Sequence, residues 1–117
     1  MAMAEYAWCS FNDNAKVVDL SSLGIADRFH PTQKPIALYE WVLSRFSKPG
    51  DKILDTHVGS ASSLIACERA GLPYVGFELD PDYYRKAVER LENERAQMSL
   101  FAATPVREET FENVSIL

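Results

Sequence analysis

The sequence predicts an α/β protein with a mostly parallel sheet, about four strands and three helices. After Asp51 the segments follow the order strand, loop, helix, strand, helix. Apolar residues recur at helical spacing over residues 36–46 and 81–97, and short apolar runs bounded by turn residues lie between them. A strand–helix–strand unit closes by a right-handed crossover into a parallel sheet. A length of 117 residues fits one domain.

The first third of the chain predicts two strands and one helix. Glu5–Phe11 is rich in aromatic and small apolar residues, and Lys16–Leu20 follows it after a turn-forming Asn-Asp-Asn, so both are predicted as strands of a hairpin-like start. Ile36–Phe46 has apolar residues at helical spacing, and Pro35 is favourable near a first helical turn.

The remaining elements alternate between strand and helix. Strands are predicted over Lys52–Asp55 and Tyr74–Leu79, and a helix over Ala61–Ala70 that Gly71 ends. A long last helix begins at Asp80-Pro81, where the aspartate suits the N-cap and the proline the first helical position, and runs to about Gln97. We expect residues 1–101 to form the domain and residues 102–117, which are polar and acidic, to form a flexible tail.

Composition excludes several classes of protein. The net charge of −5 argues against a chain that binds nucleic acid through a large basic face of its own. Cys9 and Cys67 are far apart and have no metal-binding spacing, which favours a reduced cytoplasmic protein without a metal site. No basic and apolar leader stands at the N-terminus, and no apolar run is long enough to cross a membrane.

One segment has the chemistry of a ligand-binding loop. Asp55–Ser62 (DTHVGSAS) ends a strand in an acid and turns through Gly59 into a helix, so backbone can approach a ligand closely beside helical N–H groups. Glu78 follows at the end of the next strand, where a carboxylate can accept hydrogen bonds from a ribose diol. A single glycine loop with one acid is also compatible with a plain strand–turn–helix unit.

The hexapeptide His30–Pro35 (HPTQKP) adds a second and more specific signal. This proline-bounded loop leads into a helix shortly before the glycine loop, and in this the chain resembles the DNA amino-methyltransferases, which modify the exocyclic nitrogen of adenine or cytosine. The resemblance runs from about Glu5 to Phe101 and is sharpest over His30–Pro35, Lys48–Ser63 and Val75–Asp80. It is to the class in which the catalytic motif precedes the cofactor loop, a class found in phage and prophage genomes.

The resemblance implies a partial Rossmann-like, S-adenosylmethionine-dependent methyltransferase fold and a set of cofactor contacts. Thr32 and Lys34 would contact the methionine end, with Lys34 paired to the carboxylate or a nearby acid, and Asp55 would lie under the methionine amine. Glu78 would hold the ribose hydroxyls. The remaining implied contacts are His57, Gly59 and Ser60 around the cofactor and Asp80 towards the adenine, although Asp80 has an equally good role as a helix cap. His30 would order its loop.

Three departures from the family pattern qualify this picture. The family loop reads Asp-x-Phe-x-Gly-Ser-Gly, whereas His57 replaces the phenylalanine and Ala61 replaces the second glycine. Alanine would weaken binding if that position needs a positive φ. The third departure is larger, because the catalytic Asp/Asn/Ser-Pro-Pro-aromatic motif requires a Pro-Pro pair and these 117 residues contain none.

We therefore expect a C-terminal, cofactor-binding portion of a DNA methyltransferase, with adenine N6 favoured over cytosine N4, that acts on DNA only within the complete enzyme. The catalytic motif would come from a partner chain or a missing N-terminal half. A catalytically silent remnant or regulatory module is the alternative. A nicotinamide-dependent oxidoreductase ranks low because it requires a richer glycine loop. With part of the sheet absent, an uncovered apolar face should remain, so we also expect a homo-oligomer or a partner chain.

Overall fold

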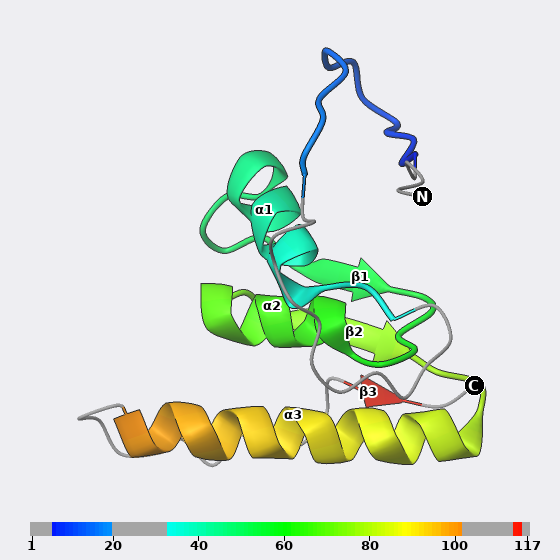
Figure 1. Ribbon diagram of the computed structural model, residues 1–117, viewed down its shortest axis with the longest axis vertical. Helices are drawn as coiled ribbons and strands as arrows, with labels where there is room; N and C mark the ends of the chain where they lie inside the picture. Colours follow the sequence, from blue (N-terminus) through cyan, green and yellow to red (C-terminus); the bar gives the residue numbers. More distant parts are fainter. Residues whose placement is uncertain (1–5, 20–32, 102–113, 116–117) are drawn as a thin grey trace.

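The computed structural model describes residues 6–19, 33–101 and 114–115 of the chain. Within them, three helices alternate with three strands (Figure 1). The elements in chain order are α1 (Ile36–Phe46), β1 (Ile53–Asp55), α2 (Ser62–Ala70), β2 (Tyr74–Phe77), α3 (Pro81–Phe101) and β3 (Val114–Ser115). All three predicted helices are present, and α1 has the predicted bounds. None of these helices is long and apolar enough to cross a membrane.

The strands form a parallel sheet in the order β1-β2-β3, as the alternation of strands and helices predicts. In the register of the first pair, Ile53 lies opposite Tyr74 and Asp55 lies opposite Gly76. On the other side of β2, Gly76 lies opposite Val114. The chain segments that follow β1 and β2 therefore leave the sheet at the same edge, where ligands of open α/β sheets bind.

Helix α2 lies at the centre of the core, between α1 and α3 (Figure 1). Its first six residues, from Ser62 to Cys67, are all buried, and Leu64 and Ile65 are among the largest fully buried side chains. Small residues in this stretch let the neighbouring elements approach closely. Tyr74 of β2 and the α3 residues Ala87 and Leu91 complete the core.

Gly76 shows how closely the loop after β1 packs on the sheet. A Cβ atom added at this buried strand position would lie 2.5 Å from Val58 Cγ2 and 2.9 Å from Leu64 Cδ1. Both distances are shorter than carbon atoms tolerate. A glycine at position 76 is therefore what allows the loop and α2 to lie directly on β2.

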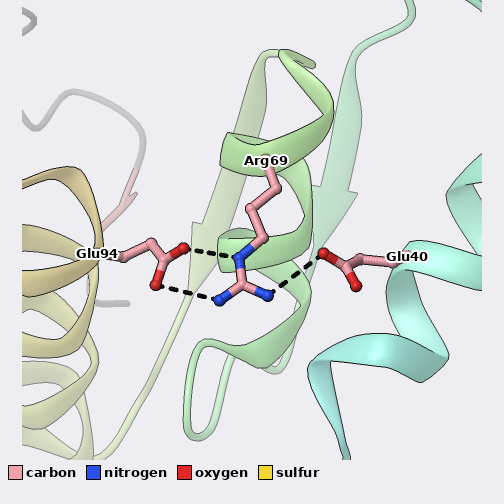
Figure 2. A network of polar contacts seen from close by, with 3 residues as sticks. All are labelled: Glu40, Arg69 and Glu94. Carbon is pink, nitrogen blue, oxygen red and sulfur yellow. Dashed lines mark hydrogen bonds and ion pairs between the residues drawn. The ribbon is translucent and has the colours of Figure 1, made fainter. Parts of the chain in front are cut away.

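Ion pairs join the three helices at the surface. Arg69 of α2 donates to Glu94 of α3 through Nε (2.6 Å) and Nη2 (3.3 Å), and to Glu40 of α1 through Nη1 (3.3 Å) (Figure 2). The carboxylates hold the guanidinium charged and raise the pKa of Arg69. One arginine therefore bridges α2 to both of its helical neighbours.

Two apolar strand side chains are exposed on the opposite face of the sheet. Because side chains alternate along a strand, Tyr74 and Gly76 point towards α2 while Val75 points away. Leu54, which lies opposite Val75 in the register, is 63% exposed, and Val75 is 41% exposed. Two apolar side chains in register thus form an exposed patch on this face.

The structure corrects the prediction of two N-terminal strands. The structure contains no strand within residues 6–19, although Glu5–Phe11 and Lys16–Leu20 were predicted as strands. Tyr6 is 96% exposed and Trp8 is 88% exposed, so their β-favouring side chains pack against nothing that would hold them in a sheet. The third strand instead comes from Val114–Ser115, within the segment predicted as a flexible tail. The sheet therefore has three strands within the described residues, where about four were expected.

Candidate functional site

Asp55 is the last residue of β1 and begins the candidate site. Its Oδ1 accepts a hydrogen bond from the backbone N–H of His57 at 2.9 Å. Its Oδ2 accepts a hydrogen bond from the hydroxyl of Ser63, in the first turn of α2. These contacts fix the carboxylate at the start of the loop. Ser63 is not among the predicted site residues, although a hydroxyl in the first turn of a helix that follows an acid-ended strand could have indicated it.

Glu78 follows β2 by one residue, at the same edge of the sheet as Asp55. Its Oε2 accepts a hydrogen bond from the Gly59 N–H at 2.7 Å, and its Oε1 accepts one from the Asp80 N–H at 3.0 Å. A carboxylate offers about four lone-pair positions, so two remain beyond these two hydrogen bonds. Glu78 therefore ties the glycine loop to β2 and still has acceptor capacity at the site.

The loop between β1 and α2 is packed against the protein and held by backbone hydrogen bonds. The Val58 N–H donates to the Phe77 carbonyl at 2.9 Å, and the Ala61 N–H donates to the Val58 carbonyl at 3.1 Å. Val58 and Ser60 are buried, whereas His57 is exposed, with its Nδ1 2.9 Å from Thr56 Oγ1. The predicted residues His57, Gly59 and Ser60 thus line one compact turn.

Positive φ angles occur at two positions of this loop. Gly59 has φ 57° and Ala61 has φ 69°. The sequence left open whether the alanine that replaces the family's second glycine sits where a positive φ is needed, and the structure shows that it does. A non-glycine residue in this region costs roughly 1–2 kcal/mol. Ala61 is also fully buried, so its methyl group is packed in the strained conformation.

The amino end of α2 faces the same region. Ala61 is its N-cap and provides no side-chain hydrogen bond to the first turn. The N–H groups of a helix's first turn lack intrahelical carbonyl partners, and the helix dipole adds partial positive charge there. The end of α2 therefore presents donors next to the acceptors of Asp55 and Glu78.

Asp80 caps α3. Its Oδ1 accepts hydrogen bonds from the backbone N–H groups of Asp82 at 2.8 Å and Tyr83 at 3.0 Å, and its carbonyl accepts one from the Tyr84 N–H. The capping role predicted as the alternative for this residue is therefore present. A contact to a ligand's adenine stays a prediction.

Arg90 is a residue of this region that the sequence did not indicate. From α3, its Nη1 donates to the Ser60 carbonyl at 2.8 Å and to Ser62 Oγ at 2.9 Å. The sequence does contain part of the information that points to Arg90. This residue lies one helical turn from Ala87 and next to Leu91, and both of these side chains are buried. A charged residue bordering the buried side of a helix generally needs a polar partner.

The hexapeptide is only partly described. His30 and Thr32 lie outside the described residues, so their predicted roles stay predictions. Lys34 is partly buried and directly precedes Pro35, the N-cap residue of α1. Gln33 beside it is a buried polar residue. The end of the hexapeptide thus packs into the protein where α1 begins.

Two acids and a glycine loop therefore meet beside a helix N-terminus at one edge of a parallel sheet. Known proteins have sequences similar to this chain. The chain is 40% identical over 65 residues to the type II methyltransferases M.HpaI of Haemophilus parainfluenzae and M2.DpnII of Streptococcus pneumoniae. It is 35% identical over 65 residues to the putative methylase YubD of Escherichia coli. These matches cover 56% of the chain but only 21%, 24% and 29% of the respective relatives.

A solved structure and a family model also match this chain. The crystal structure of the M1.HpyAVI–SAM complex matches with a TM-score of 0.52 and 35% identity, over 54% of this chain and 32% of that one. The fold is thus a partial Rossmann-like methyltransferase fold. The family model described as DNA methylase matches residues 6–89, more than half of the chain. The chain belongs to the DNA methylase family.

Proposed function

We propose that this chain is the S-adenosylmethionine-binding part of a site-specific DNA methyltransferase. The observation that carries the proposal is the placement of Asp55 and Glu78 at the ends of adjacent parallel strands, on either side of the glycine loop. A similar protein of known structure was solved as a complex with SAM, which supports S-adenosylmethionine as the cofactor here.

The residues present fit this cofactor. Glu78 keeps two acceptor positions beyond its backbone hydrogen bonds, as a ribose diol requires. Asp55 provides a fixed negative charge for the methionine ammonium group. We propose that His57, Gly59 and Ser60 enclose the cofactor and that Asp80 lies towards the adenine. Thr32 and Lys34 would bind the methionine end, where Lys34 offers a positive charge to the carboxylate.

We propose further that these 117 residues do not transfer a methyl group by themselves. Transfer requires the target amine to lie in line with the sulfonium methyl group at near-attack distance. In the family the Pro-Pro-aromatic motif holds that amine, and this sequence has no Pro-Pro pair. A partner chain or a further part of the enzyme would supply the motif and the DNA-recognition surface. We propose adenine N6, ahead of cytosine N4, as the acceptor.

Calorimetric titration with S-adenosylmethionine tests the cofactor site. Glu78→Gln retains the shape of the side chain but loses the negative charge and replaces one of the two acceptor oxygens with an NH2 donor. We therefore expect it to weaken binding by at least about tenfold. Glu92→Gln, an exposed substitution on α3, is the matched control and should bind like the native chain. Equal affinity of the native and Glu78→Gln chains would contradict the assigned site.

A methyl-transfer assay tests the second part of the proposal. With labelled S-adenosylmethionine and mixed-sequence duplex DNA, the purified chain should transfer no label, and addition of a partner polypeptide that carries the Pro-Pro-aromatic motif should restore transfer to adenine. Rapid methylation of DNA by the purified chain would refute the requirement for a second component. If the native chain binds no cofactor at all, the remnant or regulatory module becomes the better description.

A further inference from the structure

The carbonyl of Ser60 is held from a distant helix. Arg90, thirty positions later in the chain, donates one hydrogen bond from Nη1 to this carbonyl at 2.8 Å and one to Ser62 Oγ at 2.9 Å. Ser62 Oγ in turn lies 3.1 Å from Ser60 Oγ. The guanidinium therefore contacts the residue on each side of Ala61 and joins α3 to the turn between the loop and α2.

The Ser60 carbonyl belongs to the peptide group whose nitrogen is that of Ala61. Rotation about φ of Ala61 turns this peptide plane relative to α2, so a bond to the carbonyl restricts that rotation. The N–H of the same peptide donates to the Val58 carbonyl at 3.1 Å. Both ends of the plane are thus fixed while Ala61 has φ 69°, a conformation that persists in a non-glycine residue only when its surroundings enforce it.

We propose that Arg90 is a positioning residue that locks the Ser60–Ala61 peptide and thereby lets alanine replace glycine in the cofactor loop. Glycine adopts a positive φ as readily as a negative one and would need no such lock. Alanine does not, so the loop depends on the arginine. This inference rests on the proposed function for its effect on S-adenosylmethionine, whereas the lock itself is a property of the chain without ligand.

Four chains test the lock by calorimetric titration with S-adenosylmethionine: native, Arg90→Gln, Ala61→Gly and the double variant. We expect Arg90→Gln to weaken binding about tenfold, the loss that accompanies removal of a charge-assisted hydrogen bond. Ala61→Gly should restore most of the affinity in the double variant. Arg85→Gln, on the same helix and paired at the surface with Asp82, should bind like the native chain.

Recovery of affinity in the double variant distinguishes a positioning role of Arg90 from a general role in supporting the fold. An arginine that merely holds α3 in place would cause the same loss with alanine or glycine at position 61, and an equal loss in both backgrounds would overturn the proposal. Native affinity in Arg90→Gln would overturn it as well. Should Arg90→Gln fail to fold, Arg90→Lys, which keeps the charge and the apolar stem but not the fork of donors, takes its place.

Hydrogen exchange of the chain without ligand keeps this test independent of cofactor binding. The Ala61 amide should exchange faster in Arg90→Gln than in the native chain, while an amide in the centre of α2, such as that of Cys67, should be unchanged. Equal protection of the Ala61 amide in both chains would overturn the lock. Faster exchange in a chain that binds no S-adenosylmethionine would sustain the lock and reject the proposed cofactor.

Discussion

Ala61, the N-cap of α2, and Cys67, the last residue of the buried stretch of α2, are both fully buried, and burial affects each in a different way. At Ala61 it packs a methyl group in a left-handed conformation, at a cost of roughly 1–2 kcal/mol. At Cys67 it removes water from a thiol. Desolvation, together with the negative charges of Asp55 and Glu68, raises the pKa of Cys67 to about 11. A cysteine that is neutral and inaccessible at neutral pH has no role as a nucleophile.

The two cysteines should therefore react very differently. Cys9 is exposed and Cys67 is buried. Because thiolates are the reactive form, a disulfide reagent at pH 8 should modify one thiol per chain rapidly and the second only after denaturant is added. Cys9→Ser should abolish the rapid phase. Two thiols reacting at similar rates in the folded chain would contradict the burial of Cys67.

The residues fixed by local sequence were predictable, and those fixed by distant contacts were not. Asp55, Gly59 and Glu78 stand out because a strand end, a turn and a second strand end follow one another in the sequence. Arg90 reaches the loop only because α3 packs back over α2, and nothing near Arg90 in the sequence indicates Ser60 as its partner. The positive φ of Ala61 is likewise a property of the folded turn.

Among the elements, β2 and α2 depend on each other through Gly76. The nearest atoms to a Cβ at this position belong to Val58, in the loop, and to Leu64, in α2. Both side chains are buried, so neither has free space to move into. The loop that follows Asp55 and helix α2 are thus kept close to β2, the strand that precedes Glu78, by the absence of a single side chain.

Gly76→Ala should destabilise the chain although alanine is usually the better strand residue. We expect the free energy of unfolding to fall by about 1–3 kcal/mol, because the added methyl group overpacks the contact with Val58. Val75→Ala is the control one position away on the exposed face, and it should cost less. Urea titration monitored by circular dichroism measures both. An unchanged midpoint for Gly76→Ala would show that the loop does not lie against β2.

Elements with both a periodic pattern and end signals were predicted well. Helix α1 follows Pro35, α2 ends at Gly71, and α3 begins after the cap formed by Asp80. The N-terminal segment has the composition of a strand but lacks these constraints, since a strand also needs a neighbour. Strand β3, only two residues long, has no periodicity from which it could have been predicted.

At the scale of the whole molecule, one face of the sheet carries exposed apolar side chains within the described residues. Parallel sheets are almost always covered on both faces. Here Leu54 and Val75 lie exposed and in register on the face away from α2. The chain also spans only 21–29% of the length of the curated relatives it matches. Both observations support the proposal that further protein, as a second copy or a partner chain, covers this face.

Light scattering coupled to size-exclusion chromatography tests whether a second copy of the chain covers this face. We expect the isolated chain, of 13.2 kDa, to self-associate at high concentration. A variant that combines Leu54→Lys and Val75→Lys should be monomeric, because charge on the exposed face opposes its burial. A native chain that stays monomeric at high concentration would count against self-association through this face.

The most direct test of the central claim is calorimetric titration of S-adenosylmethionine into the native chain and into Glu78→Gln. The geometry of Asp55, the glycine loop and Glu78 predicts saturable binding of one cofactor per chain and at least about tenfold weaker binding without the Glu78 charge. Absence of binding to the native chain, or binding that Glu78→Gln leaves unchanged, would contradict the assignment of this sheet edge as the cofactor site.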